Sequence, residues 1–372
     1  MTPASMPVAV PPPDPALGPV ATALDGDAVA EILGVERCVP RYAKYRPGRR
    51  LLVLYELDNG EPAHLTMLPP QRADRLWARV AASGLLERVP GGARRVADLG
   101  GVLQRYPVDV RLPGLVKASV AAELVRYKPG RRAVLRYQLD GRAVYGKLRA
   151  DDAGAGNLRL ARRLLDGGIA TPPPLRYEAH MRMAVHGEAP GTRLSDLRGA
   201  ELERWMEPVA DALKRLHATP VAGLPPHSAS QEADELRAAA ATAAALLPHR
   251  RADIERLAEQ LAPAATTTTP TTIHGSFHDD QVLVGDAGVV LLDLDSAAIG
   301  DPLLDVGHFA SYLSAAGQTT ARARFLDAYG SDAPLHEAAA LLRWSSLPFR
   351  RLEPGWPEAM ERRLDLAASS IR

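Results

Sequence analysis

Apolar and polar residues alternate along two stretches in the first half of the chain. The first, residues 45–58, reads YRPGRRLLVLYELD, and the second, residues 127–140, reads YKPGRRAVLRYQLD. Alternation on either side of a Pro-Gly turn is typical of two antiparallel strands. A polar turn, a third strand-like segment and a stretch with helical spacing follow each copy. The pattern therefore predicts one small unit present twice, each copy with three strands and a helix.

The two predicted third strands differ in charge. The second copy reads AVYGKL and carries Lys147, whereas the first reads AHLTML, with Leu65 where the lysine is expected. The chain retains few lysines among its 45 basic residues, so each one is a candidate for a specific role. A solvated lysine at a strand edge is the competing interpretation. If the unit performs chemistry, only the second copy has the charge for it.

Helical spacing dominates the second half of the chain. The segments 201–220 and 231–262 carry apolar residues three and four positions apart, and the residues beyond about 310 continue the pattern. Strands followed by helices predict an α+β, bilobal chain with a small antiparallel-sheet N-lobe, duplicated, and a larger, mostly helical C-lobe. The expected divisions are a disordered Pro/Ala-rich tail at 1–24, a cap unit resembling a degenerate N-lobe at 25–110, the N-lobe at 111–183 and the C-lobe at 184–372.

Composition narrows the function classes. Hydrophobic residues make up 46% and charged residues 24%, as in a soluble globular protein, and the formal charge of +1 gives no case for nucleic acid or a charged membrane surface. Cys38 is the single cysteine, so no internal disulfide can form. That composition, with no signal peptide or membrane span evident in the sequence, leads us to expect a cytoplasmic protein.

Two polar loops lie at the ends of short apolar strands between residues 271 and 307. VLV and GVVLLDL flank a GDAG turn and predict a hairpin, with the loop from His274 to Gln281 before it and Asp293 and Asp295 after it. A carboxylate at the end of a buried strand is an efficient Mg²⁺ ligand, and the amide oxygen of Gln281 can complete a site of hard oxygens. A lone aspartate after a strand is usually a turn former, but the second loop beside it favours a metal site.

The same region carries a spaced series of residues: His274-Gly275-Ser276, Gln281, Leu291-Leu292-Asp293, Gly300-Asp301-Pro302 and Asp305. The series resembles the pattern of the aminoglycoside phosphotransferase/choline kinase-like family, relatives of the protein kinases. In that pattern H-G-D-x-x-x-x-N precedes a short hairpin, an apolar-apolar-Asp, a G-D-P and a further Asp. The resemblance covers roughly residues 118 to 312. It implies a bilobal, protein-kinase-like fold.

The resemblance also implies a nucleotide site. Lys147 would bind the phosphates of ATP or GTP, and the turn from Lys128 through Arg131 to Arg132 would cover them. The nucleotide base would lie against the backbone of four interlobe residues, which are Val185, His186, Gly187 and Glu188. Asp293 would bind Mg²⁺, with Gln281 as its second ligand. We expect Asp301, Asp305, His217 and His274 to support the loops rather than to react.

Three positions depart from the family pattern. Ser276 stands where the family has the aspartate that accepts the proton of the acceptor hydroxyl, and serine is no base at neutral pH. The helix after Lys147 contains no glutamate to pair with it. Gln281 replaces the usual Asn, a feature that looks like the maltokinase branch. General-base catalysis contributes about 10²–10⁴-fold, so the loss predicts a slow enzyme unless Asp279 or Asp280, on the same loop, substitutes. A solvated turn is the competing interpretation of that Asp pair.

Two functions follow, and the sequence leaves both open. The first is a nucleotide-dependent phosphotransferase that acts on a hydroxyl of a small molecule, such as an aminoglycoside, a sugar or an amino alcohol, with Ser276, Asp279 and Asp293 at the catalytic centre. The second is a catalytically silent pseudokinase that binds nucleotide or a protein partner. A protein kinase is disfavoured because the chain has no HRD or DFG motif.

Overall fold

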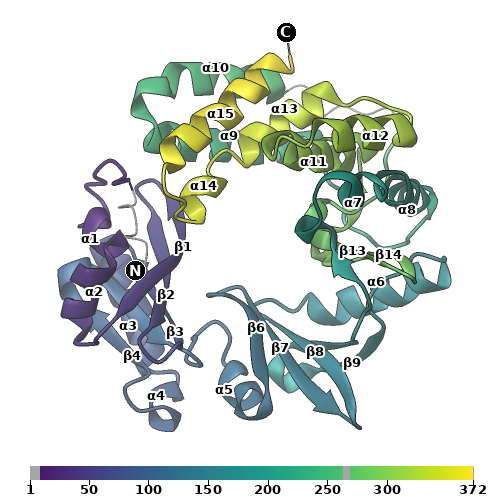
Figure 1. Cartoon of the computed structure of the whole chain (residues 1–372). Helices are drawn as coiled ribbons and strands as arrows, with labels where there is room; N and C mark the ends of the chain where they lie inside the picture. The colour runs from purple at the N-terminus through teal and green to yellow at the C-terminus, as the bar shows by residue number, and fades with distance from the viewer. Residues whose placement is uncertain (1–8, 263–268, 372) are drawn as a thin grey trace.

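Two five-stranded antiparallel sheets with the same strand order form the first half of the molecule (Figure 1). The computed structural model describes residues 9–262 and 269–371. The elements of the first sheet unit are β1 (Cys38–Arg46), β2 (Arg50–Leu57), β3 (Pro62–Met67), α3 (Pro70–Ala81), β4 (Ala93–Val96) and β5 (Gly101–Arg105). Those of the second are β6 (Glu123–Lys128), β7 (Arg132–Leu139), β8 (Arg142–Arg149), α6 (Gly154–Asp166), β9 (Pro174–Glu178) and β10 (Met183–Gly187).

The strand orders are β1-β2-β3-β5-β4 and β6-β7-β8-β10-β9. The duplicated N-lobe predicted from the repeat is therefore confirmed, and each copy contains two strands more than the alternation indicated. Between these strands lie the short helices α4 (Leu85–Arg88) and α5 (Leu115–Ala118). The pairing also corrects one position. Leu52 of the first unit pairs with Thr66, and the matching Val134 of the second pairs with Lys147, so Thr66 rather than Leu65 stands where the lysine does.

A buried aspartate anchors the Pro-Gly turn in each unit. Asp14 accepts hydrogen bonds from the Tyr45 hydroxyl at 2.8 Å and the Gly48 N–H at 2.7 Å. Asp109 does the same for Tyr127 at 3.0 Å and Gly130 at 2.7 Å. The unit repeat therefore begins at these aspartates, before the alternating strands that revealed it.

The segment before β1 is packed rather than free. Leu17, Val20 and Ala23 are buried in the core, and the helices α1 (Val20–Leu24) and α2 (Gly26–Leu33) precede β1. The disordered tail expected over 1–24 therefore does not extend through residues 14–24, because Asp14 and the apolar side chains that follow it tie this stretch to the first sheet. Residues 1–8 lie outside the described residues.

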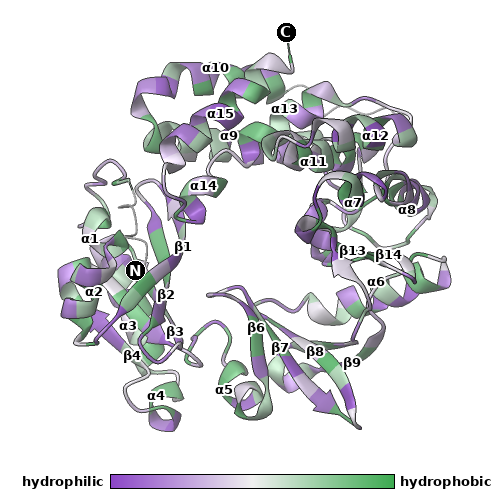
Figure 2. Ribbon diagram, viewed as in Figure 1, coloured by the Kyte–Doolittle hydropathy of each residue, from purple (hydrophilic) through white to green (hydrophobic). Residues whose placement is uncertain are grey.

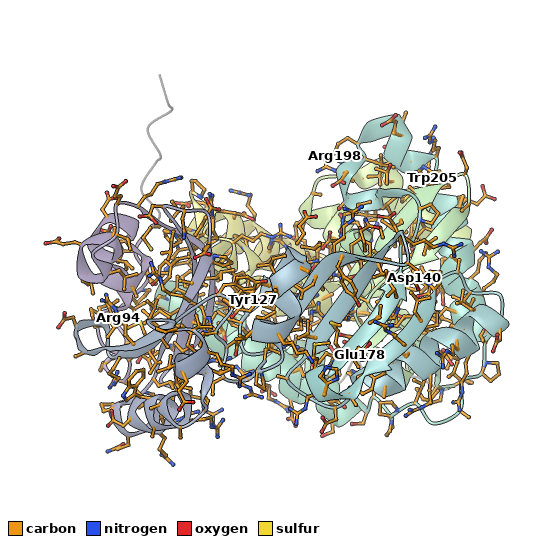
Figure 3. The ribbon with its side chains drawn as sticks, turned by 90° about the horizontal axis from the view of Figure 1, so that it is seen from below. Arg94, Tyr127, Asp140, Glu178, Arg198 and Trp205 are labelled. Carbon is orange, nitrogen blue, oxygen red and sulfur yellow. The ribbon has the colours of Figure 1, made fainter. Side chains whose placement is uncertain are left out.

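A buried polar network docks the two sheet units against each other. The Tyr127 hydroxyl lies 3.1 Å from His64 Nδ1, and His64 Nε2 lies 3.1 Å from the amide nitrogen of Gln104. Burial lowers the pKa of His64 and favours the neutral ring. Viewed from below, Tyr127 lies between the first unit, marked by Arg94, and the strands of the second, marked by Asp140 and Glu178 (Figure 3).

The rest of the chain is mostly helical. Its helices are α7 (Gly199–Glu203), α8 (Met206–Ala218), α9 (Ala229–Leu246), α10 (Arg251–Leu261), α11 (Pro302–Ala315), α12 (Thr319–Tyr329), α13 (Pro334–Arg343), α14 (Leu347–Arg350) and α15 (Trp356–Ser369). Short strands also occur, namely β11 (Thr192–Arg193), β12 (Thr271–Ile273), β13 (Val282–Gly285), β14 (Gly288–Leu291) and β15 (Ala298–Gly300). Among the described residues, no helix has both the length and the apolar character that crossing a bilayer requires.

The elements follow a closed arc in which the last helices return to the first sheet (Figure 1). Hydrophobic and hydrophilic positions alternate along most of these helices (Figure 2), as expected where one face packs inward. One large core joins the first unit to α9, α10, α13 and α15. Tyr45 packs edge-on against Phe349 of α14, with ring centroids 6.3 Å apart, and the Trp356 indole donates to the Ala9 carbonyl at 2.8 Å. The first unit therefore contacts both the second unit and the C-terminal helices.

Candidate functional site

The hairpin β13–β14 brings Gln281 and Asp293 to the same end. Val282 pairs with Leu291, and the Leu292 N–H donates to the Gln281 carbonyl at 2.8 Å. Asp293 follows in the left-handed region, with φ of 57°, which turns its carboxylate out of the strand direction. The hairpin predicted from the GDAG turn is confirmed. It places the backbone of Gln281 opposite Leu292, the residue next to Asp293.

Asp293 and Asp295 are held by cations of the second unit. Lys147 Nζ lies 2.7 Å from an oxygen of each carboxylate. Arg132 donates to Asp293 at 2.7 Å and to Asp295 at 2.9 Å. Arg149 also pairs with Asp295. These five side chains are only 12–18% exposed, so their interactions are weakly screened by solvent.

Asn157, and not a glutamate, is the residue of the helix after Lys147 that contacts this group, and its partner is Asp295 rather than the lysine. It lies in the first turn of α6 and donates to Asp295 at 2.7 Å. Asp151 and Asp152, the acids before this helix, pair with Arg149 and Arg182 instead. Lys147 therefore takes its counter-charge from Asp293 and Asp295 of the C-lobe rather than from the helix.

The electrostatics of this group favour the binding of an anionic ligand. Burial alone would raise the pKa of Asp293, but Lys147 and Arg132 outweigh it and hold that pKa well below its usual range. Burial and the charges of Arg132 and Arg126 lower the pKa of Lys128 to about 7, while Asp293 acts in the opposite direction. Lys128 thus lies near Asp293, at the turn predicted to cover phosphates. The cations of this group outnumber its carboxylates.

The loop that begins at His274 is fixed by buried hydrogen bonds. Asp305 accepts from the N–H of His274 at 2.6 Å and of Gly275 at 2.9 Å, and His217 lies 3.1 Å from it. Gly275 has φ of 75°, and a Cβ there would come within 2.2 Å of the Ser296 carbonyl oxygen. The backbone of this loop therefore requires glycine, and Asp305 has the supporting position expected from the sequence.

The two histidines and Asp301 also have structural partners. His274 Nε2 lies 2.8 Å from the Leu292 carbonyl, and the ring is fully buried. His217 is held between Asp305 and the Tyr329 hydroxyl, the latter at 2.9 Å. Asp301 caps α11 through the Leu303 N–H at 2.9 Å. These side chains fix the loops and are not arranged to exchange protons with a substrate.

The structure separates the candidate bases of the loop. Asp280 forms ion pairs with Arg126 at 3.1 Å and Arg193 at 3.2 Å. Asp279 has no lysine or arginine partner among the described residues. Its Oδ1 accepts from the Asp280 N–H at 2.9 Å and lies 3.7 Å from His278 Nδ1, and its side chain is 26% exposed. The Ser276 hydroxyl forms no hydrogen bond with another described residue. Asp279 is therefore the carboxylate of this loop that remains available to an acceptor.

The interlobe segment only partly matches its predicted role. Val185 and His186 lie in β10, between β8 and β9. The Gly187 N–H already donates to the Pro173 carbonyl at 2.8 Å, whereas the backbone of Glu188 forms no bond with another described residue. Burial lowers the pKa of His186, and the charge of Lys147 contributes, so this segment does adjoin the cation group. Glu188 is the position with backbone groups free for a base.

The donor set fits a metal only in part. Within the described residues no three His, Cys, Asp or Glu side chains converge as a metal site would require. Asp293 provides carboxylate oxygens, and Gln281, whose amide nitrogen lies 3.2 Å from His278 Nε2, retains its amide oxygen. This set suits an ion such as Mg²⁺ that takes its remaining oxygens from bound phosphate and water.

Sequence reasoning missed Arg149 and Asn157 as partners of Asp295. Arg149 lies two residues after Lys147 in the same strand and so projects to the same face, a signal that was present in the sequence. Asn157 gave no such signal, because its partner lies 138 residues away.

Comparison with known proteins places the chain. The family model described as "Phosphotransferase enzyme family" matches residues 124–342. No curated protein matches the sequence. Among solved structures, a spectinomycin phosphotransferase in complex with ADP and spectinomycin superposes with a TM-score of 0.51 at 12% identity, over 67% of this chain and 93% of that one.

Two further structures resemble it to the same degree. A choline/ethanolamine kinase family protein from Mesorhizobium loti has a TM-score of 0.50 at 15% identity, over 70% and 91% of the two chains. A GDP and kanamycin complex of APH(2")-IIIa has a TM-score of 0.50 at 17% identity, over 67% and 93%. At these identities the likeness establishes the fold, which confirms the bilobal, kinase-like architecture expected from the sequence.

Proposed function

Because the chain belongs to the phosphotransferase enzyme family, we propose that it transfers the terminal phosphoryl group of ATP or GTP to a hydroxyl of a small molecule. The observation that carries this proposal is the convergence of Lys147 and Arg132 on Asp293 at the end of the β13–β14 hairpin. Phosphoryl transfer depends mainly on positioning and on charge stabilisation, and this group provides both.

Each side chain of the group has a role when nucleotide binds. Lys147 and Arg132 exchange Asp293 for phosphate oxygens, which are stronger competitors for charge-assisted hydrogen bonds. Lys128 covers the phosphates from the turn. Asp293 and Gln281 would hold Mg²⁺, which supplies neutralisation of the phosphate charge when bound. Asp295 keeps Arg149 and Asn157 in place and so preserves the geometry of the group.

The transfer forms a bond from the acceptor oxygen to the γ-phosphorus as the bond to the β,γ-bridging oxygen breaks, and the nucleoside diphosphate leaves. The hydroxyl proton goes to Asp279, because Ser276 cannot accept it at neutral pH and Asp280 is held by two arginines. Loss of a correctly placed base reduces rate about 10²–10⁴-fold, so Asp279 would decide whether the enzyme is fast or slow.

A second candidate is nucleotide binding without transfer. It is favoured by Ser276 and by the engagement of both Asp293 oxygens, since Lys147 and Arg132 must first release them. The partner of such a pseudokinase would be a protein.

Calorimetric titration with Mg–ATP of the wild type, Asp293→Ala and Asp286→Ala tests the site. Asp286 is an exposed carboxylate in the turn of the same hairpin and serves as the matched control. We expect metal-dependent binding in the wild type and in Asp286→Ala and its loss in Asp293→Ala. Absence of binding of both Mg–ATP and Mg–GTP to the wild type would contradict both candidates.

ADP release in the presence of hydroxyl acceptors then separates transfer from silent binding. Asp279→Asn should slow transfer by about 10²-fold, and Asp280→Asn should have a much smaller effect. Turnover by the wild type would exclude the pseudokinase. Nucleotide binding without turnover, with acceptors of every charge, would favour it.

A further inference from the structure

Five cations gather where the first sheet unit, the second sheet unit and the C-terminal helices meet. Lys44 and Arg46 lie on β1, Arg50 on β2, Arg131 in the Pro-Gly turn of the second unit and Arg350 at the end of α14. We name these five residues the central cation cluster. None of them forms an ion pair with a carboxylate of the described residues. The protein therefore brings these basic side chains together without pairing them with carboxylates.

The strand register places the cluster residues of the first unit on one face of its sheet. Arg46 pairs with Arg50, and Lys44 pairs with Leu52, so these side chains lie on the same side of the sheet. Leu54, on the same face, packs against the hydrophobic cluster of the second unit. The opposite face of β1 and β2 is buried in the main core. The cluster therefore faces the second unit and not open solvent on the far side of the cap.

The cations act on one another strongly. Burial and the charges of Arg131, Arg350, Arg46 and Arg50 lower the pKa of Lys44 to about 7. The groups whose charges act on Arg50 are all arginines, and its Nε is buried without a hydrogen-bond partner among the described residues. Like charges held together in a half-buried site destabilise a fold unless an anion binds among them.

The cluster adjoins the proposed catalytic centre from two sides. Arg131 precedes Arg132, which pairs with Asp293. On the other side, Arg350 donates to the Tyr42 hydroxyl at 2.7 Å, and its charge acts on Tyr312 of α11.

Tyr312 connects the cluster to the catalytic loop. Its ring stacks on His278 with centroids 4.6 Å apart, and the charge of Asp279 also acts on it. An acceptor with its hydroxyl at Asp279 would therefore extend its body past Tyr312 toward Arg350 and Lys44.

We propose that the central cation cluster binds the acceptor, and that the acceptor is an anion: a small hydroxyl compound bearing a carboxylate or phosphate group. The inference rests on the proposed phosphotransferase function and adds its substrate class. Charge-assisted hydrogen bonds from arginine suit either group. A polycationic acceptor would be repelled by the same residues, so the cluster also selects against such compounds. The transfer chemistry is unchanged, with ATP or GTP as the phosphoryl donor and the nucleoside diphosphate as the leaving product.

Calorimetry on the full chain saturated with Mg–ADP tests the proposal. The probes are glucose 6-phosphate and glucuronate as anions, glucose as the neutral match and kanamycin as the cation. We expect an anion to bind at least about 10-fold more tightly than glucose, and kanamycin not to bind. The preferred anion identifies whether phosphate or carboxylate is recognised.

Variants assign this binding to the cluster. Lys44→Gln with Arg50→Gln should weaken the anion by about 10-fold or more. Arg41→Gln removes a cation from the same strand, but Arg41 is already paired with Glu56 at 2.9 Å, so wild-type affinity is expected. Thermal unfolding gives a second measure: neutralising the cluster should raise Tm, whereas a merely structural role for Lys44 and Arg50 would lower it.

Three results would overturn the inference: equal binding of glucose and the anions, no saturable binding of either anion, or anion affinity that Lys44→Gln with Arg50→Gln leaves unchanged. Each can occur while Mg–ADP still binds and a neutral or cationic acceptor is still phosphorylated, in which case the proposed function stands. Conversely, if Mg–ADP fails to bind, the anion titrations are run without it, and loss of affinity in the cluster variants still supports the cluster.

Discussion

The two sheet units share one scaffold but differ in what their third strands present. Both have five strands in the same order, a buried aspartate that holds a Pro-Gly turn, and an arginine at the start of the second strand. At matching positions the first unit has Thr66, which is buried, and the second has Lys147, which reaches Asp293 and Asp295 of the C-lobe.

The difference teaches that the scaffold alone does not specify the site. A sheet and a turn position side chains, but the charge of one strand position decides whether the unit can bind phosphate. The first unit uses its surfaces for contact instead: one face joins the core of the C-terminal helices, and the other carries the central cation cluster. The proposed division of labour is nucleotide at the second unit and acceptor beside the first.

Substitution of the third-strand residue tests the difference between the two units most directly. Lys147→Met should reduce kcat/KM for ATP by about 10²–10³-fold, because it removes a donor that meets phosphate charge in a site from which water is largely excluded. Thr66→Val, at the corresponding position, should change kcat/KM less than about twofold. Steady-state kinetics with ATP as the varied substrate measure both. A comparable loss in Thr66→Val would show that the first unit also contacts the nucleotide.

The two anchoring aspartates should separate stability from nucleotide binding. Asp109→Ala leaves the Tyr127 hydroxyl and the Gly130 N–H without their acceptor and should cost about 2–3 kcal/mol of unfolding free energy. It should also raise KM for ATP, since the turn from Lys128 to Arg132 loses its support. Asp14→Ala should cost about as much stability with KM unchanged.

Urea denaturation and ATP kinetics on the same preparations provide the two readouts. If both aspartate variants raise KM equally, the turn of the first unit participates in nucleotide binding, and the functional difference between the units is smaller than proposed.

Much of this comparison was visible in the sequence. The repeat predicted both hairpins because alternation around Pro-Gly is a local signal, and the short motifs around Asp293 located the site because their spacing survives without knowledge of the fold. The extra strands, such as β9 and β4, were missed because they are short and lack clear alternation.

The sequence does not show which residues contact partners far away along the chain. Assigning Leu65 instead of Thr66 was an error of one position, which flips a side chain to the other face of a strand, and only the ladder with Leu52 corrects it. Asp14 stands in a Pro-rich stretch that is typical of disorder, and its role depends on Gly48, 34 residues away. Asp295 gained its partners only through the meeting of the two lobes.

The smallest effects are expected from the half-buried lysines, Lys44 of the first unit and Lys128 of the second. The pKa of each is lowered from 10.5 to about 7 by burial and neighbouring arginines. Between about pH 7 and pH 10.5, each of these lysines therefore keeps its proton in the unfolded chain and releases it in the folded chain. The cost of burying the charge is fully present below about pH 7 and fades as pH rises toward 10.5.

Lys44→Gln and Lys128→Gln should therefore unfold with a free energy about 1–2 kcal/mol above wild type at pH 7 or below, and this advantage should shrink steadily at higher pH. Urea denaturation across pH from about 6 to about 9 measures the difference, and Arg41→Gln should show no such trend. The two variants should differ in function. Lys128→Gln should also lose affinity for Mg–ATP, whereas Lys44→Gln should retain it. A Lys44→Gln protein less stable than wild type at low pH would mean that Lys44 is neutralised by a partner in the fold, and the first unit would then have no surplus charge with which to attract an acceptor.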